Sequence, residues 1–148
     1  MRHFSALAAC VLAGMSAAGS SRADEISPMI VRHAAANNIP HALADAIVRL
    51  ESRYNARARN GANIGLTQIS RQTARSLGYA GDAAGLFDAD TNLRYGIRYL
   101  AMAYRLSGGD VCGAVMRYQS GLRATRMSHA NRVYCGKVRA LMGGRKTA

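Results

Sequence analysis

One glutamate stands where a carboxyl group could act as a general acid. Glu51 comes at the end of an apolar helical pattern, directly before the polar string Ser52-Arg53-Tyr54-Asn55, and the only other glutamate of the chain is Glu25. A carboxyl group at such a boundary can be half buried, and burial raises its pKa so that it holds a proton near neutral pH. Glu51 is therefore the first candidate for acid catalysis.

The helix that must position Glu51 is predicted from the spacing of apolar residues. After Pro40, apolar side chains recur every three or four residues, at Leu43, Ala46, Ile47, Leu50 and Tyr54. Glu51 follows Ile47 by four positions, so it lies on the flank of the apolar stripe and not on the solvated face. This is the position in which partial burial is expected.

A second catalytic carboxylate is hard to find. No acidic residue lies between Glu51 and Asp82, and Asp45 is six residues before Glu51 on the same predicted helix. The three aspartates at 88, 90 and 110 have positions typical of helix caps. Asp82, in a glycine-rich turn, is the reserve candidate for a second acid.

The other elements are also predicted to be helices joined by short polar turns. Ser27 and Pro28 favour the start of a first helix that ends near Asn38. Caps and glycine stops predict further helices over 70–77, from Asp88 or Asp90 to 107, over 110–119 and over 128–143. Residues 55–65 are rich in arginine, glycine and asparagine and predict a loop with a short extended piece. The fold class is therefore mostly α, with about six helices and a loop or small β segment after the helix of Glu51.

The first residues indicate export. A short basic start is followed by an apolar, small-residue stretch and by Ser21-Arg22-Ala23, so residues 1–23 are predicted to be a signal peptide cleaved after Ala23. The alternative is lipidation at Cys10, which ends a string similar to a lipobox. Cleavage leaves one domain, residues 24–148, in the periplasm or outside the cell. Its two cysteines, Cys112 and Cys135, are expected to form a disulfide in an oxidising compartment, the alternative being two buried thiols.

The chain is strongly basic, with a formal net charge of +12. Loss of residues 1–23 removes Arg2 and Arg22, which leaves 18 basic and 8 acidic residues and a charge of +10. Such a surface attracts polyanions. The arginines are scattered and no nucleic-acid-binding motif accompanies them, so no nucleic-acid partner is expected.

Five strings together resemble one family. They are Glu51-Ser52-x-x-Asn55, Gly65-Leu66-Thr67-Gln68-Ile69, the stretch from Asn92 to Leu100, Tyr118-Gln119-Ser120-Gly121, and the pair Tyr134 and Val138. Their order and spacing resemble the catalytic domain of the soluble lytic transglycosylases, which is related to goose-type lysozyme. The resemblance covers about residues 26–141 and implies a single lysozyme-like domain that cleaves the β-1,4 bond between N-acetylmuramic acid and N-acetylglucosamine in peptidoglycan.

The resemblance also implies roles for individual residues. Glu51 matches the residue that acts first as general acid and then as base, so that the muramic acid C6 hydroxyl closes on C1 as a 1,6-anhydro product. Ser52 matches a serine beside the acid, Gln68 a sugar-contacting amide, and Tyr118 a tyrosine whose hydroxyl approaches the catalytic carboxyl. Tyr134 has either a packing role or a place in the cleft wall.

Two positions depart from the family pattern. Thr67 stands where methionine is common, which removes an apolar thioether that packs against sugar. Gln119 stands where asparagine is common after the tyrosine, which lengthens the amide. Both changes bear on subsite geometry, and they leave hydrolysis by a muramidase as an alternative outcome.

Two further classes of function stay open. One is a non-catalytic factor that binds peptidoglycan during assembly, and the other is a cationic protein that acts on membranes. The expected partners are peptidoglycan glycan strands and an envelope-spanning secretion or motility machine, and the chain is expected to act as a monomer without a membrane span after signal cleavage. No cofactor or metal is expected, because the spacing of His33, His41 and His129 does not suit a metal site.

Overall fold

The computed structural model describes residues 20–143. Residues 1–19 and 144–148 are outside the described part, and most of the predicted signal peptide and the lipidation site at Cys10 fall there. Six α-helices, a short 3₁₀ helix and a small sheet make up the described chain, in agreement with the mostly α fold class. Their bounds are α1 Arg22–Ala36, α2 His41–Ser52, β1 Arg59–Asn60, β2 Asn63–Ile64, β3 Ile69–Ser70, α3 Arg71–Ser76, η1 Ala84–Phe87, α4 Ala89–Leu106, α5 Val111–Ser120 and α6 His129–Gly143.

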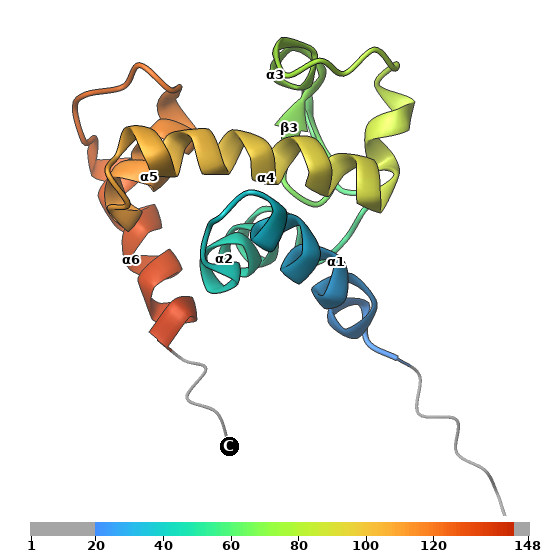
Figure 1. Ribbon diagram of the computed structural model, residues 1–148, viewed down its shortest axis with the longest axis horizontal. Coiled ribbons are helices and arrows are strands. Elements are labelled where there is room, and N and C mark those ends of the chain that lie inside the picture. Colours follow the sequence, from blue (N-terminus) through green and yellow to red (C-terminus); the bar gives the residue numbers. More distant parts are fainter. Residues whose placement is uncertain (1–19, 144–148) are drawn as a thin grey trace, which may run out of the picture.

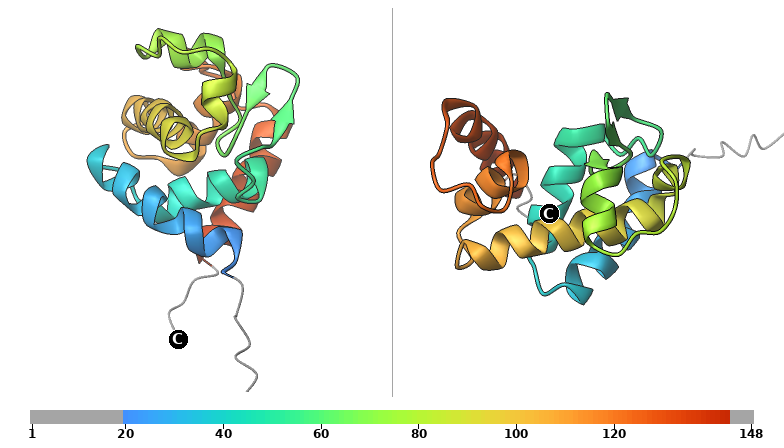
Figure 2. Two further views of the ribbon diagram at one scale, coloured as in Figure 1. Left: turned by 90° about the vertical axis from the view of Figure 1, so that its right-hand side faces the viewer. Right: turned by 90° about the horizontal axis from the view of Figure 1, so that it is seen from above.

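The longest helix, α4, is the centre of the molecule. It contacts α1, α5, η1 and β3, and Figure 1 shows it crossing the structure between α1 and α2 on one side and the α3 region on the other. The left view of Figure 2 looks along α4 and shows the other elements grouped around it. The buried stripe of α4 includes Leu93, Ile97, Leu100 and Ala101, each at most 1% exposed. This helix therefore carries the core that holds the remaining elements in place.

Local sequence signals set most helix starts correctly. The side chains of Ser70, Asp88 and Asp110 each accept a hydrogen bond from the backbone N–H three residues later, and Ser128 Oγ accepts one from the Asn131 N–H in the same way. These bonds satisfy N–H groups that the first turn of a helix leaves without a partner. The predicted caps of α3, α4, α5 and α6 are thus confirmed, with Asp88 capping α4 in preference to Asp90.

The predicted start of the first helix was wrong. Helix α1 begins at Arg22, because Ser21 and Asp24 form a capping box in which each side chain binds the other's backbone N–H. Pro28 lies inside the helix and not at its first position. The capping box stabilises an earlier start at the cost of the one hydrogen bond that Pro28 cannot donate. Cleavage after Ala23 stays a prediction, and it would remove Ser21 and with it this capping box.

The chain after α2 turns sharply into the sheet. Helix α2 ends at Ser52, so Tyr54 is outside the helix in which it was predicted, and Arg53 and Tyr54 both have left-handed backbone angles, with φ of 51° and 60°. Three two-residue strands follow as an antiparallel sheet in the order β1-β2-β3. The predicted loop with a short extended piece is therefore a small three-stranded sheet, and the predicted glycine-rich turn that contains Asp82 runs into η1.

A disulfide joins the last two helices. Cys112 at the start of α5 is bonded to Cys135 in α6, with their Cα atoms 5.3 Å apart. The disulfide prediction is confirmed, and the alternative of two free thiols is excluded. Among the described residues, no helix is both long and apolar enough to cross a membrane.

Candidate active site

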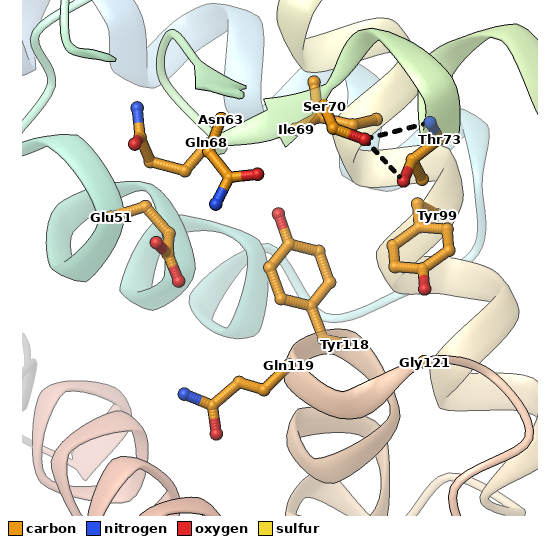
Figure 3. Close-up of a pocket in the computed structure, with 10 residues that line it drawn as sticks. All are labelled: Glu51, Asn63, Gln68, Ile69, Ser70, Thr73, Tyr99, Tyr118, Gln119 and Gly121. Atoms are coloured by element: carbon orange, nitrogen blue, oxygen red, sulfur yellow. Dashed lines mark hydrogen bonds between the residues drawn. The ribbon is translucent and has the colours of Figure 1, made fainter. Parts of the chain in front are cut away.

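A polar cleft of about 360 Å³ opens beside the C-terminal end of α2. Figure 3 shows side chains from α2, the sheet, α4 and α5 pointing toward it. Its lining residues are Glu51, Asn63, Gln68, Ile69, Ser70, Thr73, Tyr99, Tyr118, Gln119 and Gly121. Four of the five predicted site residues, Glu51, Gln68, Tyr118 and Gln119, therefore line this cleft, while Ser52 does not.

Glu51 lies in the last turn of α2 with its carboxyl group half buried in the cleft wall. Burial raises the pKa of this carboxyl above its ordinary value of 4.5, and a hydrogen bond from Tyr134 opposes part of that rise. The Tyr134 hydroxyl donates this bond to Glu51 Oε1 over 2.5 Å. The arrangement favours a protonated acid while providing a donor for the carboxylate that remains after proton transfer.

Tyr118 is close enough to Glu51 to feel its charge, but the tyrosine hydrogen-bonded to Glu51 is a different one. Tyr118 lies in the same cleft, but its hydroxyl donates to the main-chain oxygen of Thr67 over 2.6 Å. The direct partner is Tyr134, which α6 brings to Glu51 from 83 positions along the chain. Burial and the negative charge of Glu51 raise the pKa of Tyr134 far above its ordinary value of 10.0, so its hydroxyl keeps the proton that it donates.

The Tyr118 hydroxyl can act toward the cleft only as a hydrogen-bond acceptor. Burial, followed by the charge of Glu51, raises the pKa of Tyr118 well above its ordinary value of 10.0, so the hydroxyl stays protonated. Because its single hydrogen is donated to Thr67, the hydroxyl oxygen can only accept a hydrogen bond from a group in the cleft. The ring of Tyr99 lies against it, with 5.7 Å between ring centroids.

Ser52 and Gln68 brace the loop that forms the cleft floor. The Ser52 hydroxyl is buried and lies 2.9 Å from Leu66 O and 3.1 Å from Val48 O, which ties α2 to the loop. Gln68 Nε2 donates to Gly65 O over 2.9 Å. Because Gln68 also lines the cleft, its amide combines the bracing role with a surface that a sugar can reach.

The side chain of Thr67 does not face a sugar site, contrary to the expectation for this position. It is 2% exposed, and its hydroxyl and backbone N–H both donate to Asn92 Oδ1, over 2.7 and 2.9 Å. A Cβ on Gly96 would meet the Thr67 hydroxyl at 2.1 Å, so only glycine at 96 leaves room for it. Asn92 Nδ2 in turn donates to Ile64 O and Leu86 O, each over 2.8 Å. This network holds the Thr67 carbonyl to which Tyr118 donates.

Gln119 is also held by a buried amide. Asn131, 3% exposed, donates from Nδ2 to Gln119 Oε1 over 2.9 Å and contacts Ser120 and Ser128 through further hydrogen bonds. The longer amide of Gln119 therefore reaches across to α6. Asn131 belongs to none of the motifs, and nothing in the sequence distinguishes it from the other polar residues of its helix.

The aspartates considered as second acids do not line the cleft. Asp82 is exposed and accepts a hydrogen bond from the Gly85 N–H over 2.9 Å. Asp45 is buried on α2 and accepts from the Tyr54 hydroxyl. Among the cleft-lining residues, Glu51 is the single carboxyl group.

Six residues of the cleft lining were not predicted as site residues, namely Asn63, Ile69, Ser70, Thr73, Tyr99 and Gly121. Ser70 and Thr73 come from a predicted helix start, where a capping role already explained the serine, and their hydroxyls lie 3.0 Å apart. Within residues 20–143, no three His, Cys, Asp or Glu side chains are grouped so that they could hold a metal ion.

The chain is similar to known proteins in both sequence and fold. The profile of the family described as Transglycosylase SLT domain matches residues 28–134. A structure of an inactive mutant of lytic transglycosylase Slt from Pseudomonas aeruginosa superposes with a TM-score of 0.69 and 21% sequence identity, over 85% of this chain and 25% of that one. The 70 kDa soluble lytic transglycosylase from Escherichia coli gives a TM-score of 0.61 and 23% identity, over 81% of this chain and 20% of that one. This chain thus spans a quarter or less of the length of these two proteins, and at these identities the structures show a shared fold.

Proposed function

The chain belongs to the family of transglycosylase SLT domains, and we propose that it cleaves the β-1,4 bond between N-acetylmuramic acid and N-acetylglucosamine in peptidoglycan. The observation that carries this proposal is Glu51, a half-buried carboxyl group with a raised pKa in a polar cleft. A group of this kind is suited to protonate a glycosidic oxygen.

In the first step, Glu51 donates its proton to the bridging oxygen as the bond from C1 of the muramic acid breaks. The leaving N-acetylglucosamine departs with a free hydroxyl, and positive charge develops at C1. The cleft-lining residues include no second carboxyl group that could stabilise this charge. In the proposed mechanism, the acetamido group of the sugar itself stabilises it. The Tyr134 hydroxyl stabilises the new carboxylate of Glu51 through the hydrogen bond that it already donates.

In the second step, the Glu51 carboxylate removes the proton from the C6 hydroxyl of the same muramic acid. The C6 oxygen then bonds to C1 and gives a 1,6-anhydro end, and Glu51 regains the proton that it gave up. Closure within one sugar has the effective-molarity advantage of an intramolecular reaction. The Tyr118 oxygen, which can only accept a hydrogen bond, is suited to orient a sugar hydroxyl or N–H donor beside Glu51.

Hydrolysis is the competing outcome for the same cleft. An inverting hydrolase needs a second carboxylate to activate water, and a retaining one commonly uses a second carboxylate as nucleophile. Neither requirement is met by the cleft-lining residues. Thr67 in place of methionine is not expected to change the sugar subsites, because its side chain is buried away from the cleft. The anhydro product is therefore the proposed one.

We further propose that the enzyme acts as a monomer in the periplasm or outside the cell, where peptidoglycan is found. Support comes from the signal-like sequence of residues 1–23 and from the disulfide, which persists in oxidising compartments. Opening of the wall for an envelope-spanning secretion or motility machine is the proposed role.

Digestion of purified sacculi in water enriched in oxygen-18 tests the proposal. Transglycosylation gives muropeptides with anhydro ends and without the heavy label. Hydrolysis gives reducing ends that carry one heavy oxygen and a mass higher by one water. Release of labelled reducing ends alone would overturn the anhydro assignment, and no release at all would overturn the proposed activity.

A further inference from the structure

A second hollow lies on the other side of α2 from the cleft. It has a volume of about 520 Å³ and runs between α2 and α6, two helices that pack against each other. Its apolar surface comes from Leu50, Tyr54 and Leu141, and its basic rim from Arg49, Arg53 and Lys137. We refer to it as the α2/α6 groove.

The groove and the cleft are separate surfaces. No residue lines both of them. At about 100° of rotation per residue, Arg49 and Glu51 lie roughly 160° apart around α2, and Arg53 follows the end of that helix. A molecule held in the groove therefore leaves Glu51 accessible to substrate.

Within the described residues, the cations of the groove have no acidic partner. Asp90 pairs with Arg32, His33 and Arg94, none of which lines the groove. The side chains of Arg49, Arg53 and Lys137 are exposed, and none of the three forms an ion pair within residues 20–143. The rim of the groove is therefore complementary to an anionic molecule.

We propose that the α2/α6 groove docks an acidic amphipathic helix of a partner protein. A groove between two packed helices fits a third helix, whose apolar side chains would lie on Leu50, Tyr54 and Leu141. The side chains of Arg49 and Arg53 are both exposed, so glutamates on the polar side of the incoming helix would meet cations there. The groove would thus hold the enzyme on a partner while the cleft stays open, whether or not that cleft cuts the cell wall.

Two other occupants fit the groove less well. The chain's own residues 144–148 read Gly-Arg-Lys-Thr-Ala and add two cations to a basic rim. A membrane surface is broad and flat, whereas the cations here line a hollow between two helices together with apolar side chains. The helix of a partner satisfies both the shape and the charge of the groove.

A peptide titration followed by nuclear magnetic resonance tests the proposal on the full chain. The probe is a helical 15-residue peptide with leucines at spacings of three and four and glutamates beside them, and its counterpart has lysine in place of each glutamate. The acidic probe is expected to shift amide signals in residues 49–54 and 137–141, and the lysine counterpart is expected to leave them unchanged.

Matched variants separate the groove from general charge attraction. The double variant Arg49→Glu, Lys137→Glu is expected to weaken binding of the acidic probe about tenfold, as two exposed charge pairs are lost. The control Arg75→Glu, Arg105→Glu has the same net charge, changes exposed arginines elsewhere, and is expected to bind as the wild type does. Circular dichroism checks that both variants fold.

Three results would overturn the proposal. The first is a set of shifted signals spread over the surface or centred outside the groove. The second is equal weakening by both double variants, which would mean non-specific attraction to a basic protein. The third is binding to phosphatidylglycerol vesicles that depends on Arg49 and Lys137 while the acidic probe does not bind, which would make the groove a membrane contact.

Discussion

Replacement of Tyr134 by phenylalanine removes one hydroxyl and tests how Glu51 is tuned. The bond from Tyr134 Oη to Glu51 Oε1 is 2.5 Å long and becomes charge-assisted when Glu51 gives up its proton. A hydrogen bond to a charged group contributes about 1.5–3 kcal/mol. Loss of that contribution in the transition state corresponds to a fall in kcat of roughly 10- to 100-fold.

The same change has a defined effect on pH dependence. The hydrogen bond from Tyr134 lowers the pKa of Glu51, against the larger rise caused by burial. Its removal is therefore expected to raise the pKa of Glu51 further and to move the alkaline limb of the pH–rate profile upward, because Glu51 must be protonated to act as acid. The two effects differ in kind, since the rate at the optimum falls while the range of active pH extends.

The assay is the rate of soluble muropeptide release from purified peptidoglycan between pH 4 and pH 9. Tyr79→Phe is the matched control, because it removes a tyrosine hydroxyl that donates to Asp82 O over 2.8 Å outside the cleft. The control is expected to keep both the rate and the pH profile. A Tyr134→Phe enzyme with unchanged kcat, or with an alkaline limb moved to lower pH, would refute the reasoning.

Three further predictions concern stability. Burial raises the pKa of Glu51 above 4.5, so the free energy of unfolding falls as the pH rises from 4.5 through the pKa of Glu51 in the folded state. Glu51→Gln removes this charge and is expected to be more stable than the wild type by about 0.5–2 kcal/mol at pH 7. Urea denaturation at pH 7 and at pH 4 measures the difference, which is expected to disappear near pH 4. Replacement of Cys112 and Cys135 by serine opens a loop with a sequence separation of 23 and is expected to cost about 3 kcal/mol, seen as a drop in Tm on the order of 10 °C; an unchanged Tm would contradict it. Thr67→Val removes the hydroxyl that donates to Asn92 and is expected to cost about 1 kcal/mol in urea denaturation, whereas a stability equal to that of the wild type would mean that the bond contributes nothing.

Features determined by neighbouring residues were predictable from the sequence. The caps at Ser70, Asp88 and Asp110 each depend on residues within one turn, so their spacing was enough to place three helices. The flank position of Glu51 followed from the helical period in the same way. The start of α1 was missed because two local signals competed, and the capping box at Ser21 outweighed the proline at 28.

Contacts between distant segments were not predictable from these patterns. Tyr134 meets Glu51 only because α6 packs on α2, which no local spacing encodes. The direction of the Thr67 side chain depends on Gly65 and Gln68, whose φ values of 74° and 50° turn the loop so that position 67 faces α4. Both contacts affect the chemistry of the cleft. The packing of α6 on α2 provides the hydrogen-bond donor to Glu51, and the turn at position 67 provides the acceptor for Tyr118.

The central claim is that Glu51 supplies the proton that breaks the glycosidic bond. Mass spectrometry of muropeptides released by the wild type and by Glu51→Gln, at equal concentrations of folded protein, tests it most directly. The account predicts anhydro muropeptides from the wild type and none above background from Glu51→Gln. Release at a wild-type rate by Glu51→Gln would contradict it.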